Sequence, residues 1–303
     1  MRHGSVSPEP PIDFDVVSTL PSVDVPPTET KPHLTIRPRR SWLPANPKEL
    51  WSFRGLGVRF AARDITLRYR QTLLGAAWVV LVPLLGAGVL SFVFGGVADL
   101  PGPPGIPYFV FTLAGMVAWT TFSQVTTRSS AVLVGNSQLV GKVYFPRLLL
   151  PISTVLSTFV DVLVSLVLLG VLLGISGVRP GVGVITFPVW FLLMVGLALG
   201  IGLAFGALMV RYRDVQYILP VGIQFLLFAS PVAYTLASVP DSAKTLYELN
   251  PLTGLLEGMR WSLIGTERPD AWVLVYASVV AILVLLAGTL VFTRMEREFA
   301  DVI

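Results

Sequence analysis

Residues 71–98 read QTLLGAAWVVLVPLLGAGVLSFVFGGVA, a stretch that contains no charged side chain. A helix needs about 20 apolar residues to cross the hydrocarbon core of a membrane, so this stretch predicts a transmembrane helix. Five later stretches of similar length contain at most one charge each. The sequence therefore predicts an all-α membrane protein with six transmembrane helices, near residues 72–95, 107–127, 149–174, 184–209, 217–236 and 271–293.

The composition agrees with a chain that is mostly surrounded by lipid. Of the 303 residues, 53% are hydrophobic and 13% are charged, whereas a soluble domain carries about 25% charged residues. The formal net charge of +4 is too small to indicate a nucleic-acid partner. The chain has no cysteine, and His3 and His33 precede the first apolar stretch. Thiol chemistry and histidine-based chemistry within the membrane are therefore excluded, and we expect neither a metal site nor catalytic residues.

Three segments divide the chain. Residues 1–40 contain eight prolines among scattered charges, a composition that cannot bury enough apolar surface to fold. They also lack the apolar core of a signal peptide. We expect a disordered cytoplasmic tail over 1–40, an amphipathic interface helix over 46–70 and a transmembrane domain over 71–303.

The basic residues predict the orientation, because cytoplasmic loops of membrane proteins are enriched in Lys and Arg. With six spans and both termini in the cytoplasm, four of the 22 Lys and Arg residues lie outside, namely Arg179, Lys244, Arg260 and Arg268. The opposite orientation would place the great majority outside. We therefore expect a multi-pass protein of the bacterial inner membrane with N- and C-termini in the cytoplasm.

The segment 46–70 shows helical signals before the first span, although Gly55 and Gly57 weaken the helix locally. Heptad spacing places two apolar stripes on nearly opposite sides, namely Trp51, Val58 and Ile65, and Phe53, Phe60 and Leu67. Arg59 and Arg63 lie between the stripes. This helix either rests on the membrane surface with its arginines on lipid phosphates, or lies between the membrane bundle and a cytoplasmic partner.

The loop after the second span, residues 129–147, is a candidate docking segment. It resembles a phosphate loop only superficially, because Gly135 and Gly141 are six residues apart rather than five, and Val143 stands where a magnesium-binding Ser or Thr is required. ATP hydrolysis is therefore expected on a separate chain. The loop is either a coupling helix that docks on that ATPase or an ordinary amphipathic loop. Candidate coupling residues are Asn136, which can cap a short helix, Ser137, Gln138, Lys142, Tyr144, Phe145 and Arg147, with Arg211 and Arg213 after the fourth span.

Residues 240–270 are too polar for a seventh span. Asp241 can cap one short helix, and Asn250 followed by Pro251 can begin another. We expect a pair of short external helices, re-entrant or interfacial, between the fifth and sixth spans. They form either an external gate or a packed external cap, and the candidate gate residues are Leu252, Leu255, Leu256 and Met259.

Asp161 is the one charged residue in the apolar stretch 148–178. A carboxylate inside the membrane is costly and rarely faces lipid, so Asp161 either lines a transport path or makes a buried hydrogen bond between helices. No Arg or Lys lies within the neighbouring predicted spans. We therefore expect the hydrogen bond, and we expect the substitution Asp161→Asn to be tolerated.

Two further patterns lie within the spans. In the fourth span two glycine pairs have GxxxG spacing, which allows helices to pack closely; they are Gly196 and Gly200, and Gly202 and Gly206. Aromatic residues gather toward the outer ends of the first two spans, namely Phe92, Phe94, Tyr108 and Phe109, with Trp119 deeper. These aromatic residues suit either the belt at the membrane interface or a stacking surface for sugar rings along a glycan path.

Several short motifs occur in the order found in one transporter family. They are Arg63-Asp64, Arg68-Tyr69-Arg70-Gln71-Thr72, Leu74-Gly75, Lys142-Val143-Tyr144-Phe145-Pro146-Arg147, Arg211-Tyr212-Arg213-Asp214, Ser230-Pro231, Asn250-Pro251-Leu252, and the ending Arg294-Met295-Glu296-Arg297 through Phe299-Ala300-Asp301-Val302-Ile303. From about residue 34 to its end the chain resembles the ABC-2 type polysaccharide exporter permeases, the transmembrane subunits of O-antigen, teichoic acid and galactan ABC transporters.

This resemblance implies a transport subunit rather than an enzyme. The family exports lipid-linked polysaccharides, such as O-antigen or cell-wall galactan, as a homodimer bound to two copies of an ABC ATPase. ATP and Mg would then be bound by that partner, with no cofactor on this chain. The rival functions are an ABC-2 exporter of a drug or small lipid, and an ion-coupled secondary transporter. The latter usually shows internal repeats and several ionisable groups in the membrane.

Overall fold

The computed structural model describes residues 47–70, 77–296 and 299 of the 303 residues. The regular structure of these residues is helical. Five helical stretches are long and apolar enough to cross a membrane, namely Ala77–Val97, Tyr108–Gly135, Leu149–Ser176, Val182–Arg211 and Ala271–Met295. They coincide with five of the six predicted spans, so the all-α membrane fold is confirmed. The predicted tail over 1–40 lies outside the described residues.

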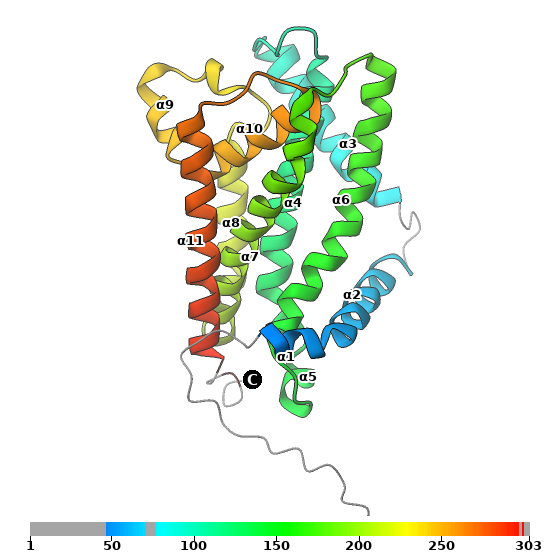
Figure 1. Ribbon diagram of the computed structural model, residues 1–303, viewed down its shortest axis with the longest axis vertical. Helices are drawn as coiled ribbons and strands as arrows, with labels where there is room; N and C mark the ends of the chain where they lie inside the picture. The colour runs from blue at the N-terminus through cyan, green and yellow to red at the C-terminus, as the bar shows by residue number, and fades with distance from the viewer. Residues whose placement is uncertain (1–46, 71–76, 297–298, 300–303) are drawn as a thin grey trace, which may run out of the picture. The chain divides into compact units, whose positions relative to one another are not determined.

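The long helices form a bundle with short helices at both ends. In chain order the elements are α1 (Pro47–Ser52), α2 (Arg54–Tyr69), α3 (Ala77–Ser91), a π-helical turn (Phe92–Val97), α4 (Tyr108–Gly135), α5 (Ser137–Lys142), α6 (Leu149–Ser176), a 3₁₀ helix (Val182–Thr186), α7 (Phe187–Arg211), α8 (Val215–Phe228), a 3₁₀ turn (Leu236–Ser238), α9 (Asp241–Glu248), α10 (Pro251–Ile264) and α11 (Ala271–Met295). Figure 1 shows α1, α2 and α5 at one end of the bundle, and α9 and α10 at the other.

Helix α7 packs against both α4 and α11, and its glycines allow the close approach. A Cβ on Gly200 would lie 2.6 Å from the carbonyl oxygen of Val284 on α11. A Cβ on Gly202 would overlap the hydroxyl of Ser129 on α4. Gly196 likewise faces α11, and Gly206 likewise faces α4. The predicted close packing is confirmed, and the two glycine pairs serve two different helices.

The fifth predicted span, residues 217–236, is shorter in the structure. Helix α8 has 14 residues, which is about 21 Å at 1.5 Å per residue, against a hydrocarbon core about 30 Å thick. The prediction of a helix to residue 236 is wrong because Pro231 disfavours helical backbone at Ser230. The irregular chain that follows α8 is nevertheless buried, since Ser230, Val232 and Ala233 are at most 2% exposed.

Arg260 on α10 supports this irregular chain. Its side chain is 2% exposed, donates hydrogen bonds to the backbone oxygens of Pro231 and Tyr234, and lies 4.5 Å over the ring of Phe111. Asn250 donates two more hydrogen bonds to the chain just before Pro231. Non-helical backbone at membrane depth is tolerated where protein covers it and satisfies its polar groups. Arg260 and Asn250 provide such hydrogen bonds to the chain after α8.

Helix α10 is a packed element. Asn250 caps it as predicted, since its side chain accepts a hydrogen bond from the backbone N–H of Leu252 at 3.0 Å. The predicted cap of α9 is wrong, because Pro240 takes the cap position and Asp241 is the first helical residue. The candidate gate residues all lie in the main hydrophobic core and are at most 3% exposed, namely Leu252, Leu255, Leu256 and Met259. Gating by α10 stays a prediction.

The segment predicted as one interface helix is divided. The chain leaves helical geometry at Phe53, between α1 and α2, close to the two glycines that lower helix propensity. Helix α2 packs on α6 through its buried residues Gly57 and Ala61. Trp51 on α1 is 70% exposed, and Val58 on α2 is 58% exposed. Two residues of the first apolar stripe are therefore mostly exposed, whereas its third residue, Ile65, is half-buried.

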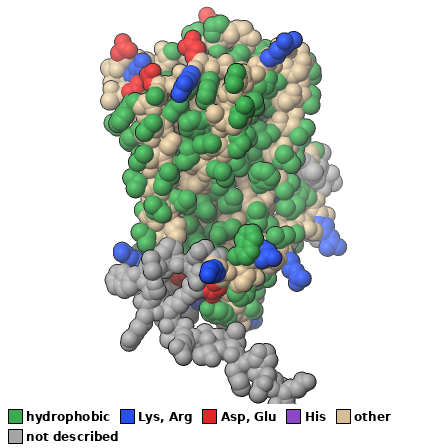
Figure 2. All heavy atoms as spheres, viewed as in Figure 1, with side chains coloured by type: hydrophobic (Ala, Val, Ile, Leu, Met, Phe, Trp, Pro, Cys, Tyr) green, Lys and Arg blue, Asp and Glu red, His purple; other side chains and the backbone are tan. Residues whose placement is uncertain are grey.

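The surface has the polarity of a membrane protein. Figure 2 shows hydrophobic side chains over the middle of the bundle, with Lys, Arg, Asp and Glu gathered toward its two ends. Val89, Val171, Leu192 and Leu283, from four different spanning helices, are each more than half exposed. Soluble proteins rarely expose apolar patches of this extent. The middle of the bundle is therefore suited to contact with lipid.

Candidate functional site

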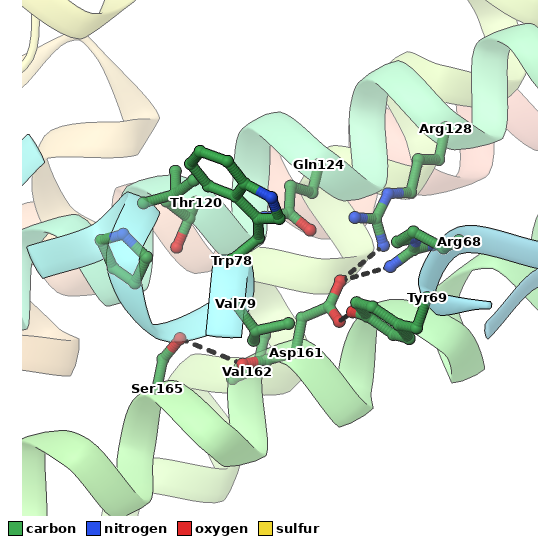
Figure 3. A pocket seen from close by; sticks show the side chains of 12 residues that line it. Arg68, Tyr69, Trp78, Val79, Thr120, Gln124, Arg128, Asp161, Val162 and Ser165 are labelled. Carbon is green, nitrogen blue, oxygen red and sulfur yellow. Dashed lines mark hydrogen bonds and ion pairs between the residues drawn. The ribbon is translucent and has the colours of Figure 1, made fainter. Parts of the chain in front are cut away.

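A cavity of about 280 Å³ lies between α2, α3, α4 and α6. Figure 3 shows Arg68, Tyr69 and Arg128 converging on Asp161 at one end of this cavity. Valine and proline side chains of α3 and α6 form its apolar wall. The cavity therefore has one strongly polar end and one apolar side.

The carboxylate of Asp161 is the centre of the polar end. Nη1 of Arg68 and Nη1 of Arg128 lie 2.6 and 2.8 Å from its Oδ2, and the Tyr69 hydroxyl donates to its Oδ1 at 2.5 Å. Arg68 also pairs with Asp64, one turn earlier on α2, at 2.7 Å. Burial, and after it the hydrogen bond to Asp161, raises the pKa of Tyr69, so the phenol stays protonated and donates. The cluster joins α2, α4 and α6.

The prediction that Asp161 has no cationic partner is wrong. The apolar pattern ends the second span at residue 127, but α4 continues to Gly135, so Arg128 lies two turns inside the helix. Arg68 comes from the last turn of α2, which packs against α6. A charged residue directly after an apolar stretch is the signal that could have indicated Arg128. The interpretation as a buried polar contact between helices remains, with two ion pairs added.

Beyond the polar end, the described lining of the cavity contains one unsatisfied polar atom, and the cavity opens to the surface. Oε1 of Gln124 is buried and accepts no hydrogen bond from any described residue. The hydroxyls of Thr120 and Ser165 donate to the backbone of their own helices. Trp78 is 47% exposed and Val82 is 50% exposed, so the cavity reaches the outer surface of the bundle along α3.

The predicted coupling loop is joined to α2. Asn136 does not cap α5 with its side chain; its Oδ1 instead accepts a hydrogen bond from Nη2 of Arg63 at 2.5 Å. Phe145 is 5% exposed, and its ring centroid lies 5.6 Å from that of Phe60. Tyr144 is 58% exposed. Tyr144, rather than Phe145, is therefore available to a partner.

The other predicted coupling and interface residues differ in their exposure. Gln138, Lys142, Arg211 and Arg213 are exposed, as are Trp51, Arg59 and Arg63; Ser137, Arg147, Phe53 and Phe60 are half-buried. Sequence reasoning missed a link between the loop and the end of α11. The guanidinium of Arg147 donates to the backbone oxygen of Glu296 and lies 5.8 Å over the ring of Phe299.

The aromatic residues proposed for a glycan path do not share one surface. Phe92 is 69% exposed, whereas Trp119 is 6% exposed and belongs to the core. Phe94 and Tyr108 both contact the irregular chain after α8, and Phe109 is half-buried. Contact of these aromatic residues with a glycan stays a prediction.

Comparisons with known proteins agree with one another. Residues 59–264 match the ABC-2 type transporter family. The O-antigen export system permease protein RfbA of Myxococcus xanthus is 31% identical over 256 residues, which are 84% of this chain and 97% of that protein. A protein of the same name from Klebsiella pneumoniae is 26% identical, over 80% of this chain and 92% of that protein. The polysialic acid transport protein KpsM of Escherichia coli is 25% identical, over 78% and 91%.

The matched region contains the elements that matter for the site. It includes most of α2 and all of α3, α4, α5 and α6, so the cavity and the coupling loop lie within it. The resemblance inferred from the short motifs is confirmed. Since the match covers most of the chain and five helices among the described residues are long and apolar enough to cross a membrane, the protein is a multi-pass membrane transport subunit that belongs to the ABC-2 type transporter family.

Proposed function

We propose that this chain is the permease subunit of an ATP-driven exporter that moves a lipid-linked polysaccharide, such as O-antigen or cell-wall galactan, across the bacterial inner membrane. The observation that carries the proposal is the similarity, over nearly their whole length, to permeases named for O-antigen export and polysialic acid transport. These names favour a polysaccharide over a drug or a small lipid as the cargo. Ion coupling is disfavoured because the carboxylate of Asp161 is already paired with two guanidiniums.

ATP and Mg belong, in this proposal, to a separate ABC ATPase. The ATPase would dock on the exposed side of this chain's coupling loop, residues 129–147, which includes Gln138, Lys142 and Tyr144. The contacts of this loop with α2 and with the end of α11 support the proposal. They give a displaced loop two connections through which it can move other helices.

The proposed unit is a homodimer with two ATPases. Helix α4 fills the middle of the described bundle, and most of its first half is buried, which leaves little room for a glycan within one copy. A path between two copies fits this packing better. The short helix α8 and the irregular chain after it would form the sixth crossing, because α8 follows α7 and leads to α9 at the other end of the bundle (Figure 1). Both termini would then lie in the cytoplasm.

Deletion of the gene in its own organism tests the function. We expect the surface glycan to disappear while lipid-linked glycan accumulates inside the cell, and we expect the wild-type gene to restore export. A variant with Tyr144→Asp should be present in the membrane at the wild-type level and still fail to export. An unchanged surface glycan in the deletion strain would contradict the proposal.

A further inference from the structure

The lining of the cavity carries an excess of positive charge. Arg68 and Arg128 are each 25% exposed, and among the lining residues Asp161 is the one acid that faces them. Asp64 also pairs with Arg68, but it is 47% exposed, so solvent screens its charge. A partly buried cation without a full counter-charge is costly. The site would therefore be stabilised by one further negative charge.

Unused hydrogen-bonding atoms indicate what could supply that charge. Nη1 of Arg128 binds Asp161 and Thr158, whereas its Nε and Nη2 make no hydrogen bond within the described part of the chain. The buried Oε1 of Gln124, one turn earlier on the same helix, has no donor there either. A phosphate group offers several acceptor oxygens to a guanidinium, often in a bidentate arrangement. A hydroxyl near the phosphate, or a bound water, would donate to Gln124.

The remaining walls indicate how such a group arrives. Val79, Val82 and Val162 make the wall beside the guanidiniums apolar, and Trp78 and Val82 are about half exposed on the outer, lipid-facing side of α3. The polar end lies where α2 meets the bundle (Figure 1). A ligand with a phosphate at one end and a hydrocarbon chain at the other matches both parts and can move in sideways from the membrane.

We propose that this cavity binds a phosphate group carried on a long apolar chain, taken from the membrane leaflet on the side of α2. Two sources share this chemistry, namely a membrane phospholipid and the lipid carrier of the exported glycan. In the second case the cavity is where the substrate first binds, and this use of the site rests on the proposed function. The binding of phosphate lipid does not rest on it.

Native mass spectrometry of the purified full chain tests the proposal with matched lipid pairs. The pairs are a polyprenyl phosphate with the corresponding polyprenol, and phosphatidylglycerol with diacylglycerol. We expect at least one phosphate lipid to bind about tenfold more tightly than its phosphate-free analogue, the effect of one charged hydrogen bond. Competition between the two phosphate lipids then assigns the source. Equal binding within both pairs, or binding of inorganic phosphate without any preference for a lipid, would overturn the proposal.

Variants test whether the preference for phosphate comes from this cavity or from other charged residues on the surface. Arg128→Gln should remove most of the preference for phosphate, whereas Arg179→Gln, an exposed position after α6, should leave it within about twofold of the wild type. Val79→Trp fills the cavity while both ion pairs of Asp161 remain, so it should also abolish the preference for phosphate. This variant keeps the proposal testable if Arg128→Gln fails to fold. A preference that survives Val79→Trp in a folded protein would contradict the site. Loss of export with this binding intact would instead count against the export function.

Discussion

At the scale of single residues, one carboxylate connects three helices. Asp161 on α6 accepts hydrogen bonds from Arg68 and Tyr69 of α2 and forms an ion pair with Arg128 of α4. Removal of one partner from a buried ion pair costs about 3–5 kcal/mol, because it leaves a buried charge uncompensated. Asn keeps the shape of Asp161 but removes the negative charge that compensates the guanidiniums of Arg68 and Arg128. The expectation that Asn is tolerated, which assumed a neutral hydrogen bond, is therefore replaced by the opposite one.

We expect Asp161→Asn to destabilise the protein by about 1–3 kcal/mol, a value reduced from that of a fully buried pair because solvent screens the two arginines. The measurement is the melting temperature in detergent. Asp64→Asn, at a half-exposed partner of Arg68, should change it much less. The double variant Asp161→Asn with Arg128→Gln should recover part of the loss, because it removes one of the two facing cations. A melting temperature unchanged by Asp161→Asn would contradict the ion-pair account.

At the scale of elements, local patterns predict what is local. Apolar length placed five spans within a few residues, except that α4 runs two turns further than its apolar stretch. The early end of α8 does have a local signal, Ser230-Pro231, but a prediction based on apolar length alone ignores it. The pairing of Arg68 with Asp161 depends on how α2 docks on α6. Neither sequence spacing nor composition contains that information, so the cavity could not be predicted.

The contact between α7 and α11 gives a prediction about packing. Gly200→Ala would place its Cβ 2.6 Å from the backbone oxygen of Val284, so the two helices must separate, at a cost of about 1–3 kcal/mol for overpacking. Gly170→Ala on α6 is the matched control, because a Cβ there meets nothing within 4 Å. We expect the first variant to lower the melting temperature in detergent and the second to leave it unchanged or raise it. Equal effects would show that the glycines do not set this contact.

The coupling loop gives a prediction that separates docking from folding. Tyr144→Asp changes an exposed side chain, so the chain should fold normally but should no longer co-purify with its ATPase. Phe145→Asp places a charge at a buried position beside the ring of Phe60, so it should reduce the amount of folded chain itself. The readouts are the yield of monodisperse protein and the ATPase bound to it. Full ATPase binding by Tyr144→Asp would rule this loop surface out as the docking site.

At the scale of the whole molecule, the two ends of the bundle should lie on opposite sides of the membrane. The chain contains no cysteine, so single cysteines can be introduced at the exposed positions Gly181 and Ser242, and at Gln138 on α5. An impermeant maleimide added to intact cells should label the first two and not the third. Labelling of Gln138 alone would reverse the proposed orientation. Labelling of Gly181 without Ser242 would mean that α8 and its irregular continuation do not cross.

The central claim, that this chain moves polysaccharide with energy from a separate ATPase, is tested most directly in inside-out membrane vesicles. The vesicles contain the chain with its ATPase and a radiolabelled lipid-linked glycan on their outer face. We predict that ATP makes the glycan resistant to an added glycosidase, that vesicles with either subunit alone show no protection, and that Tyr144→Asp abolishes it. Protection without ATP, or with this chain absent, would contradict the account.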